Sequence, residues 1–599
     1  MEKRLTRSEV PAELTWNLDD LFPTPQAWET ELAAVAGALG SVTKYKGRFG
    51  ESAHVFLECL EAQEAFQARA MRVMSYASLK QSADGTDPAN QIAAGRVGAL
   101  MARIGAETSF IRSEALNLPE GALDRYLKEE PGLDLFRHAI ERMIEEKPHV
   151  LSPETEVALA ALGEVLNAPS MIYERSKAAD MTFEPVVDGK GNQRPMSFAG
   201  YEDSYETSPD IVLRRNAFAS FTKALKNYQN TYGATWGIEV KKNVVVAKLR
   251  GFPSAVHMLL DRQEVTVDVY NNLHDIILKE LAPHMRRYAQ LRKKVLGLDR
   301  MLYCDIEVPL DPEFSPETTF EKGSEIILNG LKAMGPEYRE IIATGLKNRW
   351  IDLADNVGKS TGAFCSSIYG VHPYILITWT NRMRNALTLS HELGHAGQGV
   401  LSQRNQRLVN TRPSMFFIEA PSTINELIVG NYILSQSSDV RMRRWVIMQF
   451  LMTYHHNFVR HLIEGELQRR IYALAEKGQP ITANTLSRVQ GEVLDEFWGG
   501  EVEIDDGARL TWMRQPHYYR GLYPYSYSAG LTTGTAVAKA IREEGKPAVD
   551  RWLGVLKAGG TRKPLELAKM AGVDMTDPNT IRSAVAYVGS LVDEVVKSF

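Results

Sequence analysis

The chain has 599 residues, so it can bury a large hydrophobic core and is expected to divide into more than one domain. Its formal net charge is −5, with both signs interspersed, which gives no electrostatic case for binding nucleic acid or a membrane surface. No window of 18 or more apolar residues predicts a membrane span, and the N-terminus lacks the apolar stretch of a secretory signal. Three cysteines, odd in number and far apart, fit a reducing compartment. We therefore expect a cytoplasmic protein.

Most of the chain has the periodicity of helices. In the first half, Asp87 and Pro88 form a helix start signal, after which apolar residues recur on one face at Val97, Leu100 and Ile104. No linker rich in proline, glycine or serine interrupts the chain, and no short repeat is present. The pattern predicts a mainly helical protein.

Strand-like segments are few. Residues 189–192 (GKGN) predict a turn rather than a phosphate loop, because no strand-to-helix switch surrounds them. Met301–Val308 has a strand-like pattern, and two further short strands are predicted at 362–365 and 372–377. An exposed edge of such a sheet can hold an extended peptide by backbone pairing, although a plain structural hairpin explains the pattern equally well.

The most informative motif is His391-Glu392-Leu393-Gly394-His395. Histidines four residues apart on a helix lie on one face, about 5–6 Å apart at Cβ, so both can reach one tetrahedral Zn²⁺. Glu392 follows the first histidine and can act on a water at the metal. No proline interrupts residues 381–389, so a helix is expected to run through the motif. The motif indicates a zinc peptidase active site, with a chance match as the alternative.

A third ligand must come from elsewhere in the chain. A metzincin would continue with glycine and histidine where this chain has Gln398 and Leu401, so that class is excluded. A second helix is predicted to begin near Pro421, with Glu419 at its opening and Glu426 two turns later on the same face. A carboxylate that completes a two-histidine site leaves the fourth position open for water, as in catalytic zinc sites. Either glutamate can be a ligand or orient one; a solvated helix residue is the ordinary alternative.

A long helical stretch, Val446–Lys477, carries three more histidines. They are His455, His456 and His461. Nothing in the local pattern connects them to the zinc motif, so we interpret them as packing residues of the core and its rim.

The segments HELGH (391–395) and EAPSTINE (419–426) together resemble the oligoendopeptidase F branch of the thimet oligopeptidase superfamily of zinc metallopeptidases. The opening segment Thr15–Phe22 (TWNLDDLF) is similar to the start of that branch. Met181–Phe183 and the segment 241–255 are similar to it too. The resemblance therefore covers nearly the whole chain, and the two paired motifs are specific.

The resemblance implies a role for each acidic residue of the two motifs. Glu419 corresponds to the third metal ligand, and Glu426 to a residue that orients a ligating histidine. Glu392 corresponds to the general base. One departure is Gln398, where many members of the family carry a further histidine. That position is not a metal ligand in this interpretation, so the zinc site is expected to survive.

Residues 517–527 (HYYRGLYPYSY) hold a histidine and five of the 23 tyrosines. Phenol and imidazole groups can stabilise an oxyanion without competing for the metal. In the related family, a histidine and one or two tyrosines of this region play that part, and His517 and Tyr525 are the best matches. Tyr523 and Tyr527 are further candidates, because Gly521 and Pro524 leave the register open. An aromatic packing cluster under a loop is the alternative.

The resemblance implies a mainly α fold of two helical halves around a deep substrate channel, with a small β-sheet beside the zinc helix. We place an N-terminal helical half near residues 1–200 and a zinc-peptidase catalytic half near 201–599. The expected function is a zinc-dependent endopeptidase that hydrolyses internal bonds of short, unfolded peptides, with Glu392 as general base. The chain's own features leave the oligomeric state open.

Two other functions stay open at this point. One is a helical zinc carboxypeptidase or dipeptidase, which would share the HExxH motif and a downstream glutamate. The other is a non-catalytic peptide-binding protein with a vestigial zinc site. An intact Glu392 argues against the second, because binding zinc alone requires no general base.

Overall fold

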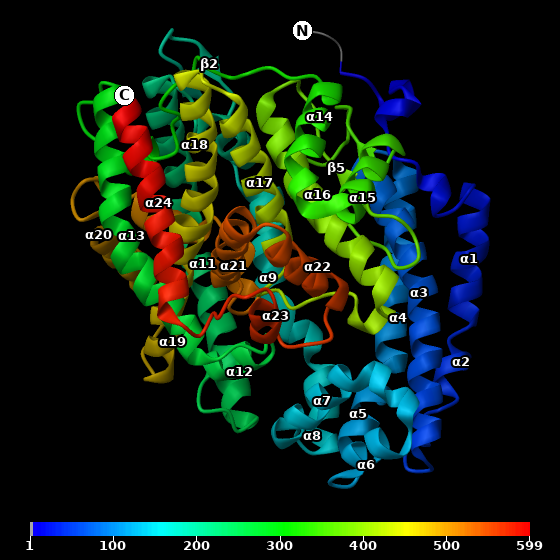
Figure 1. Cartoon of the computed structure of the whole chain (residues 1–599). Coiled ribbons are helices and arrows are strands. Elements are labelled where there is room, and N and C mark those ends of the chain that lie inside the picture. Colours follow the sequence, from blue (N-terminus) through cyan, green and yellow to red (C-terminus); the bar gives the residue numbers. More distant parts are fainter. Residues whose placement is uncertain (1–3) are drawn as a thin grey trace.

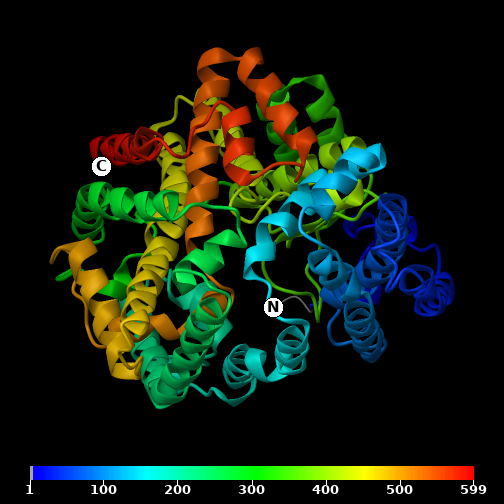
Figure 2. The same ribbon diagram turned by 90° about the horizontal axis from the view of Figure 1, so that it is seen from below.

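The computed structural model describes residues 4–599, apart from the side chain of Pro153. Helices account for 71% of the structure and strands for 3%, which confirms the predicted mainly α fold. Figures 1 and 2 show the N-terminal helices (blue) and the C-terminal helix (red) on opposite sides of the molecule. No helix in the described part of the chain is both long and apolar enough to cross a membrane.

The N-terminal helices have the capping signals that their sequence offers. Thr24, Ser52 and Asp87 each accept a backbone N–H bond at a helix start, which satisfies one of the free donors there. The start predicted at Asp87 and Pro88 is thus confirmed. These helices are α1 (Pro25–Gly37), α2 (Gly40–Thr43), α3 (Ala53–Ala83), α4 (Pro88–Thr108), α5 (Phe110–Asn117), α6 (Ala122–Glu129), α7 (Arg137–Glu146), α8 (Pro153–Ala161) and α9 (Gly163–Arg175).

The rest of the chain builds a larger helical body. Two long helices, α11 (Ile211–Leu249) and α13 (Val267–Val295), are joined by α12 (Ala255–Asp261). The last helix, α24 (Pro578–Ser598), packs along α13. The remaining α-helices of this body are α10 (Phe198–Gly200), α14 (Phe320–Gly330), α15 (Gly335–Lys347), α16 (Met383–Asn405), α17 (Ala420–Gln436), α18 (Val440–Tyr454), α19 (His461–Glu476), α20 (Ala483–Trp498), α21 (Pro524–Glu544), α22 (Lys546–Ala558) and α23 (Pro564–Met570).

A three-stranded sheet forms where strands were predicted before the HELGH helix. Its strands are β3 (Ile351–Asp352), β4 (Phe364–Ser366) and β5 (Tyr374–Leu376). The order is β3-β5-β4, with β3 parallel and β4 antiparallel to β5, so β4 lies at an edge. Both β4 and β5 contact α16. The predicted small sheet beside the zinc helix is therefore present.

The sheet joins two hydrophobic cores. One core, formed by residues 16–140, receives Tyr374 and Leu376 of β5. The other, formed by residues 173–595, receives Ile375 and Ile377. Because side chains alternate between the two faces of a strand, β5 inserts residues into both cores. The predicted division at residue 200 stays a prediction.

The strand predicted at Met301–Val308 is wrong, because this segment forms a 3₁₀ turn at Tyr303–Asp305. Asp305 is fully buried, and its carboxylate accepts bonds from Arg214 and Arg215. The same carboxylate accepts the backbone N–H of Leu302. The backbone bends so that these donors can reach the buried Asp305 carboxylate. This requirement outweighs the strand propensity of the flanking residues.

The turn predicted at residues 189–192 is confirmed. It joins β1 (Val186–Val187) to β2 (Gln193–Arg194), which pair antiparallel. Asp188 organises it by accepting the backbone N–H groups of Lys190 and Asn192. The segment is a hairpin connection and not a phosphate loop.

Candidate active site

Helix α16 carries both histidines of the HELGH motif on one face. The His391 and His395 rings lie 5.3 Å apart, as a four-residue spacing predicts. The helix approaches α17 so closely that a Cβ at Gly394 would lie 2.6 Å from Ser422 Cα. The glycine between the two histidines therefore allows α17 to bring its own residues to the site.

Glu419 stands at the N-cap of α17, where the sequence predicted it. Its Oε2 lies 3.5 Å from His391 Nε2 and 3.4 Å from His395 Nε2. The Ser422 hydroxyl donates to the same oxygen at 2.9 Å. Two ring nitrogens thus converge on one carboxylate oxygen, and the three residues form a cluster that can hold a metal ion.

Glu426 contacts the other nitrogen of His391. Its Oε2 lies 3.5 Å from His391 Nδ1, and its Oε1 accepts the Thr453 hydroxyl at 2.6 Å. Burial alone would raise the pKa of Glu426, but His391 outweighs it and the pKa lies below its usual range. A carboxylate in this place fixes the ring so that Nε2 faces the cluster.

The cluster has a negative field that favours a cation. Burial opposes a charge on His391, yet its bonds to Glu419 and Glu426 and the charge of Glu392 raise its pKa to about 10. The pKa of Glu419 lies well below its usual range, because both histidines outweigh the effect of its burial. Two imidazoles and one carboxylate are the donor set of catalytic zinc sites, so these residues fit Zn²⁺. A metal would replace the proton on His391, since only a neutral imidazole can be a ligand.

Glu392 lies beside the cluster on α16 and is only 6% exposed. Burial raises the pKa of its carboxyl group, and Glu419 adds to this while His391 and His395 oppose it. Among the described residues, no hydrogen-bond donor reaches its carboxylate. The group is therefore placed to exchange a proton with a water rather than to hold a partner side chain.

The aromatic segment brings His517, Tyr523 and Tyr527 together. The His517 ring lies 5.2 Å from that of Tyr523 and 5.7 Å from that of Tyr527, and the Tyr527 hydroxyl donates to the Tyr523 hydroxyl at 3.0 Å. Burial raises the pKa of Tyr527, with Tyr523 next in effect, and the charge of Glu419 adds to it. Helix α21, which carries Tyr527, packs against α17, whose N-cap is Glu419.

Tyr525 faces away from this group. It is fully buried, its hydroxyl donates to Gln263 Oε1 at 2.7 Å, and its ring packs edge-on against Tyr270. Tyr523 is the N-cap of α21 and lies four residues before Tyr527, so the two share a face, whereas position 525 lies on another face. We therefore revise the candidate oxyanion donor from Tyr525 to Tyr523 or Tyr527.

Two residues of α19 lie next to His517: His461, which the sequence analysis interpreted as a packing residue, and Glu464, which it did not name. Glu464 Oε2 is 3.2 Å from His517 Nδ1 and 2.9 Å from His461 Nδ1, and the three form a second cluster of metal-type donors. His461 is buried as expected, but it also stacks on Tyr527 at 4.2 Å. A histidine and a glutamate three residues apart on one helix face were the available signal.

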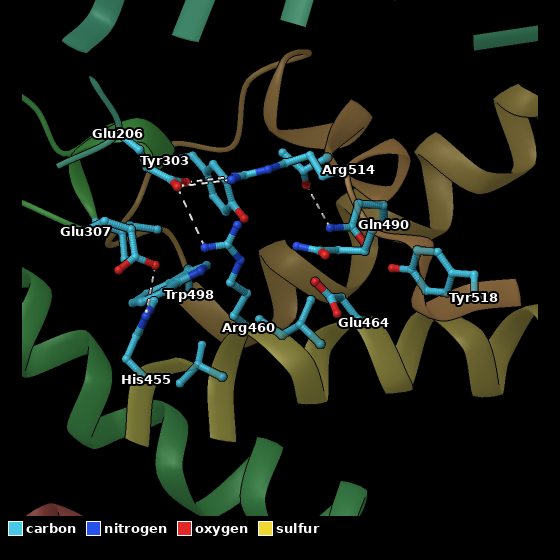
Figure 3. Close-up of a pocket in the computed structure, with 15 residues that line it drawn as sticks. Glu206, Tyr303, Glu307, His455, Arg460, Glu464, Gln490, Trp498, Arg514 and Tyr518 are labelled. Atoms are coloured by element: carbon cyan, nitrogen blue, oxygen red, sulfur yellow. Dashed lines mark hydrogen bonds and ion pairs between the residues drawn. The ribbon is translucent and has the colours of Figure 1, made fainter. Parts of the chain in front are cut away.

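Glu464 also lines a small cavity of about 40 Å³. Figure 3 shows it beside Arg460 and Gln490, with Arg514 across the cavity. Burial alone would raise the pKa of Glu464, but His461 and His517 outweigh it and the pKa lies below its usual range. Glu464 is therefore ionised and can hold the Nδ1 protons of both histidines.

Comparisons with known proteins identify the family. Residues 204–587 match the model of Peptidase family M3, and residues 114–183 match that of Oligopeptidase F. The chain belongs to peptidase family M3.

Similar sequences and solved structures support this family assignment. The chain is 35% identical over 589 residues to oligopeptidase PepF of Bacillus subtilis, across 98% of this chain and 88% of the relative. The solved oligoendopeptidase-F from Enterococcus faecium is 27% identical with a TM-score of 0.76, across 96% of this chain and 99% of that one. A solved chain from Chlamydophila abortus has a TM-score of 0.85 at 24% identity, across 98% and 100% of the two chains, which shows the fold alone.

The family membership confirms the resemblance seen in the sequence. The chain is a metallopeptidase, and its function is that of an endopeptidase that acts on short peptides. This excludes the non-catalytic binding protein as the function of the chain.

Proposed function

We propose that this metallopeptidase uses zinc, held by His391, His395 and Glu419, to hydrolyse internal bonds of short peptides. The observation that carries the proposal is the convergence of two Nε2 atoms on one Glu419 oxygen, at 3.5 and 3.4 Å. Bound there, zinc would act as a Lewis acid and bring the pKa of a water towards about 7. Glu426 orients His391 through its Nδ1 atom.

Glu392 is the general base of the proposal. Its carboxylate has no hydrogen-bond donor among the described residues, so it can accept a proton from the attacking water. It then delivers that proton to the nitrogen of the leaving amine. Its raised pKa supports the first step, because a carboxylate with a higher pKa is a stronger base towards the attacking water.

His517 and either Tyr523 or Tyr527 stabilise the oxyanion. In the proposal His517 acts as the imidazolium, which donates from Nδ1 to Glu464 and from Nε2 to the substrate oxygen. Glu464 accepts the first of these bonds and is therefore a positioning residue. The two tyrosines share one hydrogen bond, in which Tyr523 is the acceptor, so the Tyr523 proton is available for the substrate oxygen.

The edge strand β4 is the proposed track for the substrate backbone. It pairs on one side with β5 and contacts α16, whose residues form the metal cluster. An extended peptide that adds to this edge would be held through its main chain, with little selection among side chains. A cytoplasmic location stays a prediction, and the three unpaired cysteines fit a reducing compartment.

The experiment is product analysis of one end-blocked peptide of about ten residues, by mass spectrometry, with and without a chelator. Internal cuts that disappear on chelation and return with Zn²⁺ support the proposal. Trimming of the unblocked peptide from one end, with the blocked twin intact, would instead assign a carboxypeptidase or dipeptidase. Cleavage that persists in metal-free protein would overturn the metal mechanism.

A further inference from the structure

A hollow of about 650 Å³ opens beside Tyr523. Its walls come from α8, α9, the end of α11, α12 and the segment 519–523. A second hollow of about 740 Å³ adjoins it and reaches α5 and α7; the two share Glu156, Ala160, Arg250 and Arg262. Each has the size of a ligand site. The hollows therefore extend from the proposed oxyanion donor into the N-terminal helices.

The wall of the first hollow has an excess of positive charge, although the whole chain is acidic. Two of its cations are neutralised, since Arg250 pairs with Glu156 at 2.7 Å and Lys242 with Glu239 at 2.6 Å. Two others, Arg262 and Arg520, have no hydrogen-bond or ion-pair partner for their guanidinium groups among the described residues. The uncompensated charge of the hollow is thus concentrated on two arginines.

Arg262 has the environment of a cation that lacks a counter-ion. It follows directly after α12 and remains accessible to solvent, yet it lines both hollows. Burial lowers the pKa of its guanidinium, and the neighbouring charges of Arg250 and Arg112 lower it further, while Glu146 and Asp261 oppose this without forming an ion pair with it. A carboxylate placed against it would relieve this repulsion and form a charge-assisted, forked hydrogen-bond pair.

We propose that the hollow is a substrate subsite that binds a peptide carboxylate, with Arg262 as its anchoring cation and Arg520 as a second positive charge on the wall. The inference rests on the catalytic centre proposed above, because Tyr523 lines the hollow and contacts His517. Two sources can supply the carboxylate: the C-terminus of the peptide, or an acidic side chain on the same side of the cut bond. A terminal anchor would also explain why short peptides are chosen.

The test uses the full-length, zinc-loaded protein and one internally quenched peptide in two forms, with a free C-terminal carboxylate and with a C-terminal amide. The readout is the ratio of kcat/KM for the acid over the amide. We expect a ratio of about 10 to 100 for the wild type, the range of one hydrogen bond to a charged group. Arg262→Gln should bring the ratio to about 1, and Arg262→Glu should bring it below 1.

A matched control is Arg562→Gln. Arg562 is also exposed and without a partner among the described residues, but it lines neither hollow. This variant should keep the wild-type ratio. A second series of C-terminally amidated peptides, each with one glutamate at a different position, distinguishes an acidic side chain from the C-terminus as the source of the carboxylate. A preference for glutamate at one position, lost in Arg262→Gln, assigns the subsite to an acidic side chain.

Three results would overturn the proposal. The first is a wild-type ratio near 1 together with no preference for glutamate at any position. The second is an Arg262→Gln variant that lowers kcat/KM for all peptides equally, since the ratio would then be unchanged. The third is an equal loss of the ratio in Arg562→Gln. Failure of the wild type to cleave either form internally would refute the proposed function instead, so the two failures are distinguishable.

Discussion

Two clusters in this molecule have the same composition, two histidines and one glutamate, yet their geometry differs. In the first, His391 and His395 direct Nε2 atoms at Glu419 over 3.4–3.5 Å, and the side chains are 20–27% exposed. In the second, His461 and His517 direct Nδ1 atoms at Glu464 over 2.9–3.2 Å, and the side chains are 3–12% exposed. The longer distances of the first suit three ligands around one ion, whereas the second has the distances of hydrogen bonds. This difference supports the proposal that the first cluster holds a metal and the second holds protons.

The largest effect is expected from removing the carboxylate of each cluster in turn. Glu419→Gln should lose bound zinc, and its activity should fall to that of chelated protein, because the two histidines alone bind the metal weakly. Glu464→Gln should keep one zinc per chain. Metal content by elemental analysis, with kcat on a blocked peptide, checks both. A loss of metal in Glu464→Gln would break the comparison.

Glu392→Gln should keep its zinc and lose turnover. The expected fall in kcat is about 10²- to 10⁴-fold, the usual contribution of a positioned general base. Metal content and kcat, measured on the same sample, check this. Near-normal turnover would show that another group takes the proton.

The next largest effect on kcat is expected from replacing the tyrosines of the aromatic segment. Removing an oxyanion donor typically lowers kcat by about 10²- to 10³-fold, and we expect this for at least one of Tyr523→Phe and Tyr527→Phe. Tyr525→Phe should instead act on stability, since it removes a buried hydrogen bond to Gln263 worth about 1 kcal/mol. A kcat for Tyr525→Phe lower than for both other variants would contradict the revised assignment.

Glu464→Gln should lower kcat by about 10- to 100-fold with little change in KM, because it leaves the substrate contacts in place and weakens only the positioning of His517. In a His517→Gln background the same substitution should have no further effect on kcat. Steady-state kinetics of the two single variants and the double variant measure this. Independent, multiplicative losses would show that Glu464 acts on something other than His517.

His274 is a buried histidine without a carboxylate partner. It therefore shows how burial alters a histidine pKa when no glutamate is paired with the ring. Burial lowers the pKa of His274 to about 4, from an ordinary value near 6.5. The unfolded chain takes up a proton between these pH values and the folded chain does not, so the free energy of unfolding should fall as the pH drops from 6.5 towards 4. His274→Gln should reduce this slope without changing zinc content. Denaturant unfolding at several pH values checks it; an unchanged slope would contradict it.

Local patterns in the sequence predicted the parts of the site that lie within single elements. The four-residue spacing of HELGH and the proline after Glu419 were sufficient for α16 and for the start of α17. The face of Tyr525 depended on where α21 begins, and that start follows from Pro524 only once the loop before it is known. The contact of Glu464 with His517 joins residues 53 apart in sequence, which no local pattern encodes.

Buried charge and distant packing account for the other differences. Met301–Val308 had a strand-like pattern, but pairing of Asp305 with two arginines determined its shape. The hollow around Arg262 is formed by segments between residues 156 and 523 that meet only in the folded chain.

The most direct test of the two-cluster account is anomalous diffraction at the zinc absorption edge from crystals of the purified protein. We predict a single strong peak between His391, His395 and Glu419, and none between His461, Glu464 and His517. A peak at the second cluster, or no peak at the first in active protein, would contradict the account.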